Sequence, residues 1–288
     1  MRIASAPGEL ERIARAVALG TFDGVHVGHQ AVVRAAVETG LAPTVLTFHP
    51  HPREVLGNRV ELLATLERRL ELLADLGVAE TLVVEFTPAL AELTPEEFAA
   101  SYLRAIGAEL VVAGEGFRFG RHRGGDLALL GELGFGTRVV PQVPGVSSTD
   151  IRRLLREGDL GAAARMLGRP PEVEGVVVSG DARGGTLGFP TANLRVEQGL
   201  LVPRFGIYAG AALGHRAALS IGVNPHYGGA ERRVEAFLLD FDGDLYGQRL
   251  VVSLWERLRD EAAFASEAEL VAQIERDVAA ARAAKPPG

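Results

Sequence analysis

Two histidines stand near each other in the segment Gly20-Thr-Phe-Asp-Gly-Val-His-Val-Gly-His29, which follows an apolar run and precedes a helical pattern. At this spacing both imidazoles and the free N–H groups of a helix N-terminus can face one anion. His26 and His29 could then donate hydrogen bonds to phosphate oxygens that gain charge as bonds break, and Gly28 permits close backbone approach. The same pair could also be core histidines or half of a metal site.

A second polar cluster, Val146-Ser-Ser-Thr-Asp-Ile-Arg152, precedes another helical pattern. Ser147 or Ser148 would cap that helix. Hydroxyl groups with an arginine one turn further on suit a polyphosphate. Taken alone, the cluster is also an ordinary capping sequence.

The second half of the chain holds a further group of candidates. Alternation along Leu187-Gly-Phe-Pro-Thr-Ala-Asn193 places Thr191 and Asn193 on one side of an extended segment. A hydroxyl and an amide oxygen are hard ligands that suit Mg²⁺ shared with ATP phosphates. Segment 180–185 would form a flexible loop whose backbone N–H groups cover phosphates. Glu235 lies in an apolar strand context, where a carboxylate requires a reason, although an exposed strand face would also explain it.

The composition narrows the chemistry. The 288 residues carry a net charge of −7 and include no cysteine, and every one of the 30 basic residues except Lys285 is arginine. Disulfides, thiolate metal sites and thiol nucleophiles are therefore excluded, as are a lysine-dependent P-loop and Schiff-base catalysis from the core. The acidic balance and the aromatic content of 6% argue against a nucleic-acid partner.

Hydrophobic residues at 47% against 23% charged residues predict a folded chain. No apolar run approaches the ~20 residues of a membrane span, and the start of the chain does not resemble a signal peptide. We therefore expect a cytoplasmic protein that acts on small molecules, without nucleic acid or membrane. A homo-oligomer is left open.

The elements that must position these residues change type along the chain. In the first half, short apolar runs alternate with helical patterns, as in a doubly wound parallel sheet that binds ligands at the carboxyl ends of its strands. The expected strands are 16–19, 44–48, 81–85, 110–113 and 138–141. The expected helices are 29–38, 66–76, 95–106, 125–133, 149–157 and 160–167.

Gly168-Arg-Pro-Pro171 then breaks the pattern and predicts a boundary between domains 1–168 and 169–288. Short strands and a terminal helix beyond it predict a small closed antiparallel barrel. Residues 234–240 and the turn Asp242-Gly-Asp244 predict a hairpin arm and its turn. The expected strands are 173–179, 206–212, 217–223, 233–241 and 248–254, and the expected helix is 267–284.

Seven ordered motifs resemble those of one family. In the first half, segments 20–29, 47–52, 114–120 and 147–152 resemble the FMN adenylyltransferase module of prokaryotic bifunctional FAD synthetases, an H-x-G-H nucleotidylyltransferase. In the second half, segments 180–194, 234–247 and 258–264 resemble riboflavin kinase. The resemblance covers nearly the whole chain, and the motifs follow the family's order.

The resemblance implies a Rossmann-like α/β doubly wound nucleotidylyltransferase domain followed by a riboflavin kinase barrel with a C-terminal helix. Such an enzyme phosphorylates riboflavin with MgATP to FMN and then transfers AMP from a second ATP to FMN, giving FAD and pyrophosphate. One alternative is a transferase for another nucleotide with a non-catalytic accessory barrel. Another is a flavin-binding module on a degenerate transferase.

The resemblance also implies roles for single residues. His26 and His29 would stabilise the leaving pyrophosphate, and Glu235 would accept the proton of the riboflavin 5′-hydroxyl. The implied ATP contacts of the adenylyltransferase are Phe22, Asp23, Gly24, Gly28, Ser148, Thr149 and Arg152. Those of the kinase are Gly180, Arg183, Gly184, Thr191 and Asn193, the last two also holding Mg²⁺. The implied flavin contacts are Phe48 and Arg259.

Three positions depart from the family's pattern. Gly185 replaces a usual arginine, which would either weaken the grip on phosphate or pass that contact to Arg183. Gly116 replaces a usual Asp or Asn and removes a side-chain contact to nucleotide or flavin. His226 replaces a usual threonine.

Overall fold

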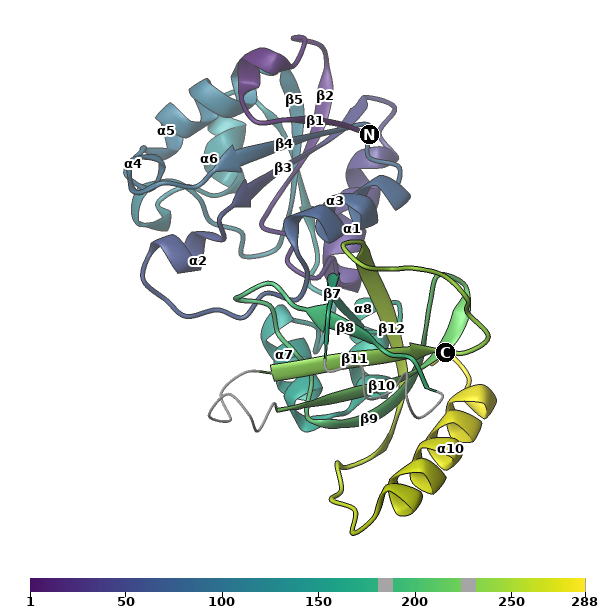
Figure 1. Ribbon diagram of the computed structural model, residues 1–288. Coiled ribbons are helices and arrows are strands. Elements are labelled where there is room, and N and C mark those ends of the chain that lie inside the picture. The colour runs from purple at the N-terminus through teal and green to yellow at the C-terminus, as the bar shows by residue number, and fades with distance from the viewer. Residues whose placement is uncertain (181–188, 224–231, 288) are drawn as a thin grey trace. The chain divides into compact units, whose positions relative to one another are not determined.

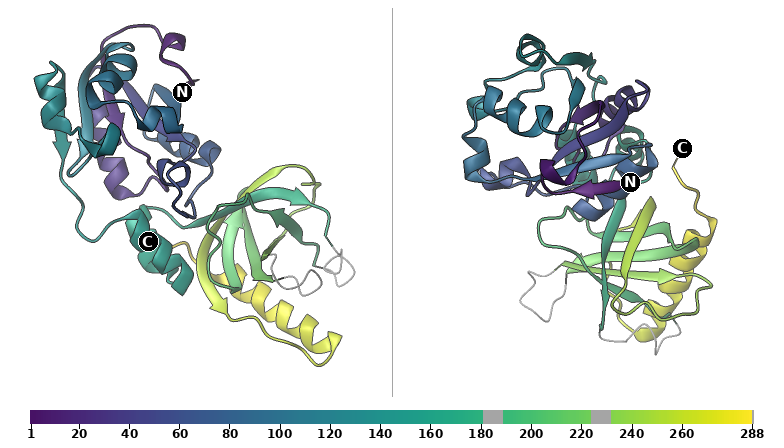
Figure 2. Two further views of the ribbon diagram at one scale, coloured as in Figure 1. Left: turned by 90° about the vertical axis from the view of Figure 1, so that its left-hand side faces the viewer. Right: turned by 90° about the horizontal axis from the view of Figure 1, so that it is seen from above.

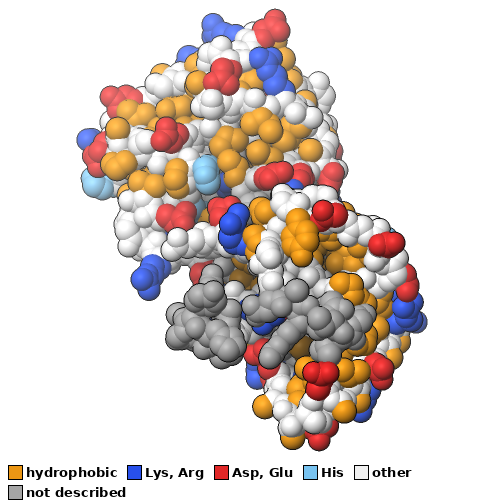
Figure 3. Space-filling view, in the orientation of Figure 1, with side chains coloured by type: hydrophobic (Ala, Val, Ile, Leu, Met, Phe, Trp, Pro, Cys, Tyr) orange, Lys and Arg blue, Asp and Glu red, His pale blue; other side chains and the backbone are white. Residues whose placement is uncertain are grey.

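The computed structural model describes residues 1–180, 189–223 and 232–287. The chain forms two compact units, Met1–Ser148 and Thr149–Gly288 (Figure 1). Within the described ranges, no helix has both the length and the apolar character needed to cross a membrane. On the face shown in Figure 3, basic side chains stand between acidic and hydrophobic ones, as on an ordinary mixed protein surface.

The first unit is built on a six-stranded parallel sheet of order β1-β4-β3-β2-β5-β6. The five expected apolar runs form five of these strands. The sixth, β1, has three residues, two of them exposed, so it carries no apolar signal. The strands are β1 Arg2–Ala4, β2 Arg15–Leu19, β3 Ala42–His49, β4 Glu80–Glu85, β5 Ala108–Gly114 and β6 Gly136–Val140.

Helices cover both faces of this sheet (Figure 2). Along β2, Val17 and Leu19 belong to one core cluster while Ala16 and Ala18 belong to the other, as the period of two in a strand requires. The doubly wound arrangement is therefore confirmed. The helices are α1 Val27–Val37, α2 Pro52–Val55, α3 Leu66–Asp75, α4 Pro88–Ala91, α5 Pro95–Phe98 and α6 Leu127–Glu132, with short 3-10 or π turns at Pro7–Glu9, Ala99–Arg104 and Arg121–Arg123.

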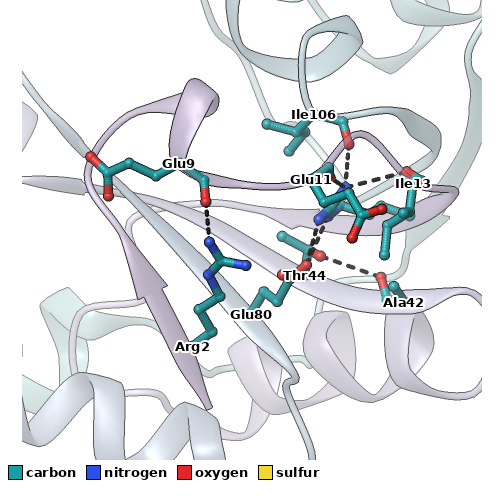
Figure 4. Close-up of polar contacts among 9 residues, drawn as sticks. Arg2, Glu9, Glu11, Ile13, Ala42, Thr44, Glu80 and Ile106 are labelled. Carbon is teal, nitrogen blue, oxygen red and sulfur yellow. Dashed lines mark hydrogen bonds and ion pairs between the residues drawn. The ribbon is translucent and has the colours of Figure 1, made fainter.

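Hydrogen bonds from the Arg15 side chain link the amino ends of the central strands (Figure 4). Its side chain is fully buried, pairs with Glu80 of β4 at 2.6 Å and donates to the carbonyls of Glu11, Ile13 and Ile106. A buried cation requires this many partners, because its desolvation is otherwise uncompensated. These polar contacts of Arg15 lie at the amino end of β2, whereas the histidine segment follows its carboxyl end.

The second unit is a closed barrel of order β10-β11-β8-β7-β12-β9, with every neighbouring pair antiparallel. Helix α10 packs on β9 and β10 through alanines, and Trp255 lies beside them. The expected barrel with a terminal helix is confirmed. Its strands are β7 Glu172–Val178, β8 Ala192–Arg195, β9 Gly206–Ala212, β10 His215–Val223, β11 Arg232–Leu238 and β12 Arg249–Arg259, and α10 is Glu267–Ala283.

The expected hairpin was wrong. Strand β11 pairs with β10 and β8, whereas β12 pairs with β7 and β9, so the turn at 242–244 joins strands that are not neighbours. The physical reason is β8, a strand of four residues that occupies the second edge of β11. The segment that looked like a hairpin turn lines a cavity instead.

Helices α7 (Ser148–Glu157) and α8 (Leu160–Leu167) belong with the barrel, apart from Ser148 itself. The carbonyl of Leu155 accepts from the backbone N–H of Arg204 at 3.0 Å, and α8 packs on β12. The compact units thus divide the chain earlier than the predicted boundary at 168, which stays a prediction.

Candidate active sites

The two histidines lie side by side where α1 begins. His26 is the N-cap of α1, and its Nδ1 accepts from the backbone N–H of His29 at 3.3 Å. The two imidazoles are stacked, with centroids 3.6 Å apart and planes 17° apart. Phe22 meets the ring of His29 edge-on at 5.4 Å. The spacing read from the sequence therefore does bring both imidazoles to one helix N-terminus.

The loop before α1 has an unusual backbone. Phe22, Gly24 and Val25 have φ values of 53°, 78° and 42°, in the left-handed region that a β-branched residue such as valine rarely adopts. A Cβ on Gly24 would come within 2.7 Å of Leu63, and one on Gly28 within 3.2 Å of the His26 ring. Strained loops of this kind cluster at ligand sites, where the surrounding structure must hold them.

Asp23 anchors this loop. Its buried carboxylate accepts from the backbone N–H of Leu63 at 2.9 Å, and its carbonyl accepts from the Ser148 hydroxyl at 3.1 Å. The structure therefore brings Ser148 to the histidine loop. Thr149 and the buried Arg152 lie on α7 in the second unit, and their contact with ATP stays a prediction.

Arg69 on α3 is a residue that our reading of the sequence missed. It is 5% exposed, and it donates to the carbonyls of Thr21 at 2.6 Å and Phe48 at 3.2 Å. The helix 66–76 was predicted from its pattern of apolar residues, and its charged residues were not proposed as part of a site. Arg69 stands three and four residues before the buried Leu72 and Leu73, however, which puts it on the buried face.

Burial lowers the pKa of His29 well below its ordinary value, and the neighbouring His26 and Arg69 lower it further. The imidazole is therefore neutral near pH 7. Its Nδ1 and the Nε of Arg69 are buried without a hydrogen-bond partner among the residues that the structure describes. Unsatisfied polar atoms of this kind require an explanation, and a bound ligand is one.

Two positions of the first unit were linked to the flavin from the sequence: Phe48 as a contact, and Gly116 as a place where a usual contact is missing. Phe48 is 8% exposed and packs in a core of aromatic rings, with Phe86 at 5.7 Å and Phe98 at 6.2 Å between centroids. Gly116 has φ 76°, a conformation that glycine adopts freely and that Asn and Asp also tolerate. Its departure from the family pattern thus keeps the turn and removes only the side chain.

In the second unit, a cavity of about 330 Å³ lies between the outer face of β10 and β11 and helix α10. Glu235 lines it and stands opposite Asn193 of β8 and Ser220 of β10, so these three side chains share one face of the sheet. Arg233 on the same strand forms an ion pair with Glu235. The rings of Phe189 and Phe237 and the α10 residues Leu270, Ile274 and Val278 supply apolar walls.

A second cavity of about 270 Å³ is lined by the loop between β11 and β12, including Asp242, Asp244 and Tyr246. Thr191 lines both cavities. Two spaces for small molecules therefore meet at Thr191, and the carboxylate of Glu235 borders the larger one.

The asparagine predicted as a metal ligand, Asn193, lies against the backbone of Gly180. A Cβ on Gly180 would come within 2.2 Å of the Asn193 amide nitrogen, so the side chain of Asn193 occupies the space beside the Gly180 backbone. Arg183, Gly184 and the departures Gly185 and His226 lie outside the described residues.

Arg259 lines the larger cavity and is held there by α10. Its guanidinium donates to both carboxylate oxygens of Asp277, with the shortest distance at 2.6 Å. Glu261 lies nearby against Gly222 of β10, and burial raises the pKa of the Glu261 carboxyl while Arg259 opposes the change. Arg233, Glu261 and Asp277 were not singled out from the sequence, because a charged residue in a strand, loop or helix gives no local signal of the partner that it will meet.

Comparison with known proteins assigns a family model to each half of the chain. Residues 10–152 match the family model of FAD synthetase, and residues 167–285 match that of riboflavin kinase. The bifunctional riboflavin kinase/FMN adenylyltransferase of Listeria monocytogenes is 39% identical, over 92% of this chain and 90% of that protein. The chain belongs to this family of bifunctional enzymes. The family, the fold class and the two-step function in FAD biosynthesis that the sequence predicted are confirmed at this level.

Further relatives of this bifunctional riboflavin kinase/FMN adenylyltransferase family agree. The proteins of that name from Bacillus subtilis and Escherichia coli K12 are 35% and 36% identical, each over at least 90% of both chains. A crystal structure described as a macrolide-efflux protein from Streptococcus pneumoniae matches with a TM-score of 0.85 at 31% identity, covering 97% of this chain and 98% of that one. The two-part fold is therefore shared over the whole length.

Proposed function

We propose that the histidine loop carries out adenylyl transfer to FMN and that the barrel cavities carry out riboflavin phosphorylation. For the kinase, the supporting observation is that two cavities meet at Thr191 with Glu235 in the larger one. For the adenylyltransferase, it is the stacked pair His26 and His29 at the start of α1. We also propose a cytoplasmic location, because both reactions consume ATP.

In the kinase, riboflavin would occupy the larger cavity, whose apolar walls suit a flat aromatic ring system. ATP would occupy the smaller one, so that its γ-phosphate reaches the 5′-hydroxyl near Thr191. The hydroxyl oxygen forms a bond to the γ-phosphorus, the bond from that phosphorus to ADP breaks, and Glu235 accepts the hydroxyl proton. Arg233 would hold the Glu235 carboxylate in one orientation through the ion pair.

Thr191 and Asn193 suit Mg²⁺. Both offer neutral oxygen donors, Thr191 borders both cavities, and the Asn193 amide is held against the Gly180 backbone. When bound, the ion would neutralise part of the charge of the ATP phosphates.

In the adenylyltransferase, a phosphate oxygen of FMN would attack the α-phosphorus of ATP, and the bond to pyrophosphate would break. Because Nδ1 of His26 accepts a backbone N–H, neutral His26 carries its proton on Nε2 and can donate there. The neutral His29 supplies a second donor. Two donors fixed before the reaction would stabilise the charge that develops on the leaving pyrophosphate.

Reciprocal variants test this division. With riboflavin, ATP and Mg²⁺, chromatographic separation of the flavins should show FMN and FAD for the wild type. His29→Ala should lower FAD formation about 10²-fold or more, the scale for one lost donor, and keep FMN formation. Glu235→Gln should lower FMN formation by roughly 10²–10⁴ and still make FAD from added FMN.

The exposed residues His122 and Glu256 offer matched controls. His122→Asn and Glu256→Gln should change neither reaction. If His29→Ala lost both activities equally with its fold intact, the histidines would not be specific to adenylyl transfer. If Glu235→Gln phosphorylated riboflavin normally, the base would lie elsewhere.

A further inference from the structure

Arg69 and Arg15 are both buried arginines of the first unit, yet they are satisfied differently. Arg15 forms a direct ion pair with Glu80 and donates to three carbonyls. Arg69 makes its hydrogen bonds in the described structure only to two carbonyls, those of Thr21 and Phe48, and its Nε has no partner there. A cation held in this way is costly to bury, so a purely structural role explains Arg15 better than Arg69.

The two carbonyl groups that accept hydrogen bonds from Arg69 lie near the carboxyl ends of two different strands, β2 and β3. Thr21 follows β2 and directly precedes the strained segment that contains Phe22, Gly24 and Val25, whereas Phe48 lies near the end of β3. The hydroxyl of Thr47 donates to the same Thr21 carbonyl at 3.1 Å. Arg69 therefore ties the first residues of the strained loop to the neighbouring strand, and the loop in turn sets the position of His26.

The titratable groups that act on His29 directly or through a neighbour come from three elements. His26 caps the same helix, Arg69 reaches in from α3, and Asp23 of the loop acts on Arg69. The positive charge of Arg69 disfavours a second positive charge on His29. It also favours an anion in a site where the Nδ1 of His29 lacks a partner.

We propose that Arg69 is a positioning residue for adenylyl transfer: it holds the histidine loop in its strained conformation and places a fixed positive charge beside His29. The inference rests on the proposed function of His26 and His29. Arg69 need not touch the reacting atoms, because its hydrogen bonds go to the backbone of the loop.

Two substitutions separate the charge from the hydrogen bonds. Arg69→Lys keeps a positive donor, and Arg69→Gln keeps a neutral donor. The neighbouring Arg68, which pairs with Glu71 at 2.7 Å and is partly exposed, gives the matched control Arg68→Gln. Each variant is compared with the wild-type full chain for FAD formation from FMN and ATP across pH, and the His29 imidazole is titrated by NMR.

We expect Arg69→Gln to lower FAD formation about 10²-fold, the cost of misplacing reacting groups by about 1 Å. It should also raise the midpoint of the His29 titration, since a neighbouring positive charge is removed. Arg69→Lys should restore much of the rate and keep the wild-type midpoint. Arg68→Gln should match the wild type. The FMN phosphate titrates alike in all of them, so differences between pH profiles report on the protein.

An unchanged His29 midpoint and unchanged FAD formation in Arg69→Gln would overturn the inference, provided that His29→Ala loses FAD formation. Normal FAD formation in His29→Ala would instead overturn the proposed function. If Arg69→Gln does not fold, Arg69→Lys tests the proposal in its place. This variant keeps the positive charge, so the His29 midpoint should stay low. A midpoint shifted to the ordinary histidine value would contradict the proposal.

Discussion

At the scale of single residues, the first unit keeps a histidine neutral by burying it. The pKa of His29 is lowered first by burial and then by its neighbours His26 and Arg69. A group whose pKa is depressed in the folded state binds its proton at a lower pH than in the unfolded chain. As the pH falls below the ordinary histidine value, the unfolded state therefore binds more protons and the fold loses stability.

We accordingly predict that the NMR midpoint of His29 in the free enzyme lies well below 6.5, the ordinary value. The His29 signal is identified by its absence from the His29→Ala spectrum. A His29 midpoint at or above 6.5 would contradict this prediction, because the imidazole would then be solvated.

A prediction for the metal follows from the chemistry of two side chains. Thr191 and Asn193 bring no negative charge, so Mg²⁺ should bind weakly to the protein alone and much more tightly when ATP phosphates complete its ligands. Calorimetry with Mg²⁺, first alone and then with a non-hydrolysable ATP analogue, measures both cases. Tight binding of Mg²⁺ to the free protein would point to an acidic site instead.

Sequence reasoning reached the residues that carry a local pattern and missed those that depend on a partner far along the chain. His26 and His29 share one helix start, so their spacing alone predicted their meeting. Arg69 lies 48 residues from the carbonyl of Thr21 that it binds. Such pairings are set by the packing of α3 on the sheet, which no short segment contains.

At the scale of elements, strands were predictable where they are apolar and long, and their partners were not. The runs that became β2 to β5 contain continuous buried stretches. Strand β6 is mostly exposed but still has the apolar pair Val139 and Val140. Strands β1 and β8 have only three and four residues. Strand β8 nevertheless decides the pairing of β11, and its omission produced the wrong hairpin. A short strand adds little to the hydrophobic pattern by which strands are recognised in a sequence. It nevertheless affects the strand order of a barrel as much as a long strand does.

Helix α10 acts as one wall of the larger cavity, and Asp277 links it to Arg259 of β12. Both side chains are largely buried, so the removal of one charge leaves the other without compensation. We predict that Asp277→Asn raises the KM for riboflavin roughly tenfold, which corresponds to about 1.4 kcal/mol, because Arg259 and the wall move.

The exposed Glu275 on the same helix gives the control Glu275→Gln, which should behave as the wild type. FAD formation from added FMN should be unchanged in Asp277→Asn, because that reaction belongs to the first unit. An unchanged KM for riboflavin would mean that α10 covers the cavity without shaping it.

At the scale of the whole molecule, the chain joins two units with separate cores and separate candidate sites. Along the chain, helix α7 begins within the motif 147–152, and α8 ends just before the barrel strands begin. Their buried side chains, Leu155, Leu160, Ala163, Ala164 and Leu167, lie in the unit that contains the barrel. A sequence break at Gly168-Arg-Pro-Pro171 marks the end of a helix, and the packing of that helix decides to which unit it belongs.

Two fragments therefore test the boundary. Residues 169–288 contain the whole barrel and α10, so we expect this fragment to fold and to convert riboflavin to FMN. Residues 149–288 add α7 and α8, whose buried leucines contribute about 1.5–3 kcal/mol each when fully buried. The longer fragment should unfold at a higher temperature, by at least about 5 °C. Circular dichroism on heating measures this difference.

The same fragments locate the kinase base. Glu235→Gln should abolish most riboflavin phosphorylation in both, by roughly 10²–10⁴, while Glu256→Gln should not. Neither fragment should form FAD, since the histidine loop is absent. If only 149–288 folds, the second domain begins at α7 and the predicted boundary at 168 is wrong. If both fragments fold and neither phosphorylates riboflavin, the kinase site needs residues of the first unit, because these are the residues that both fragments lack.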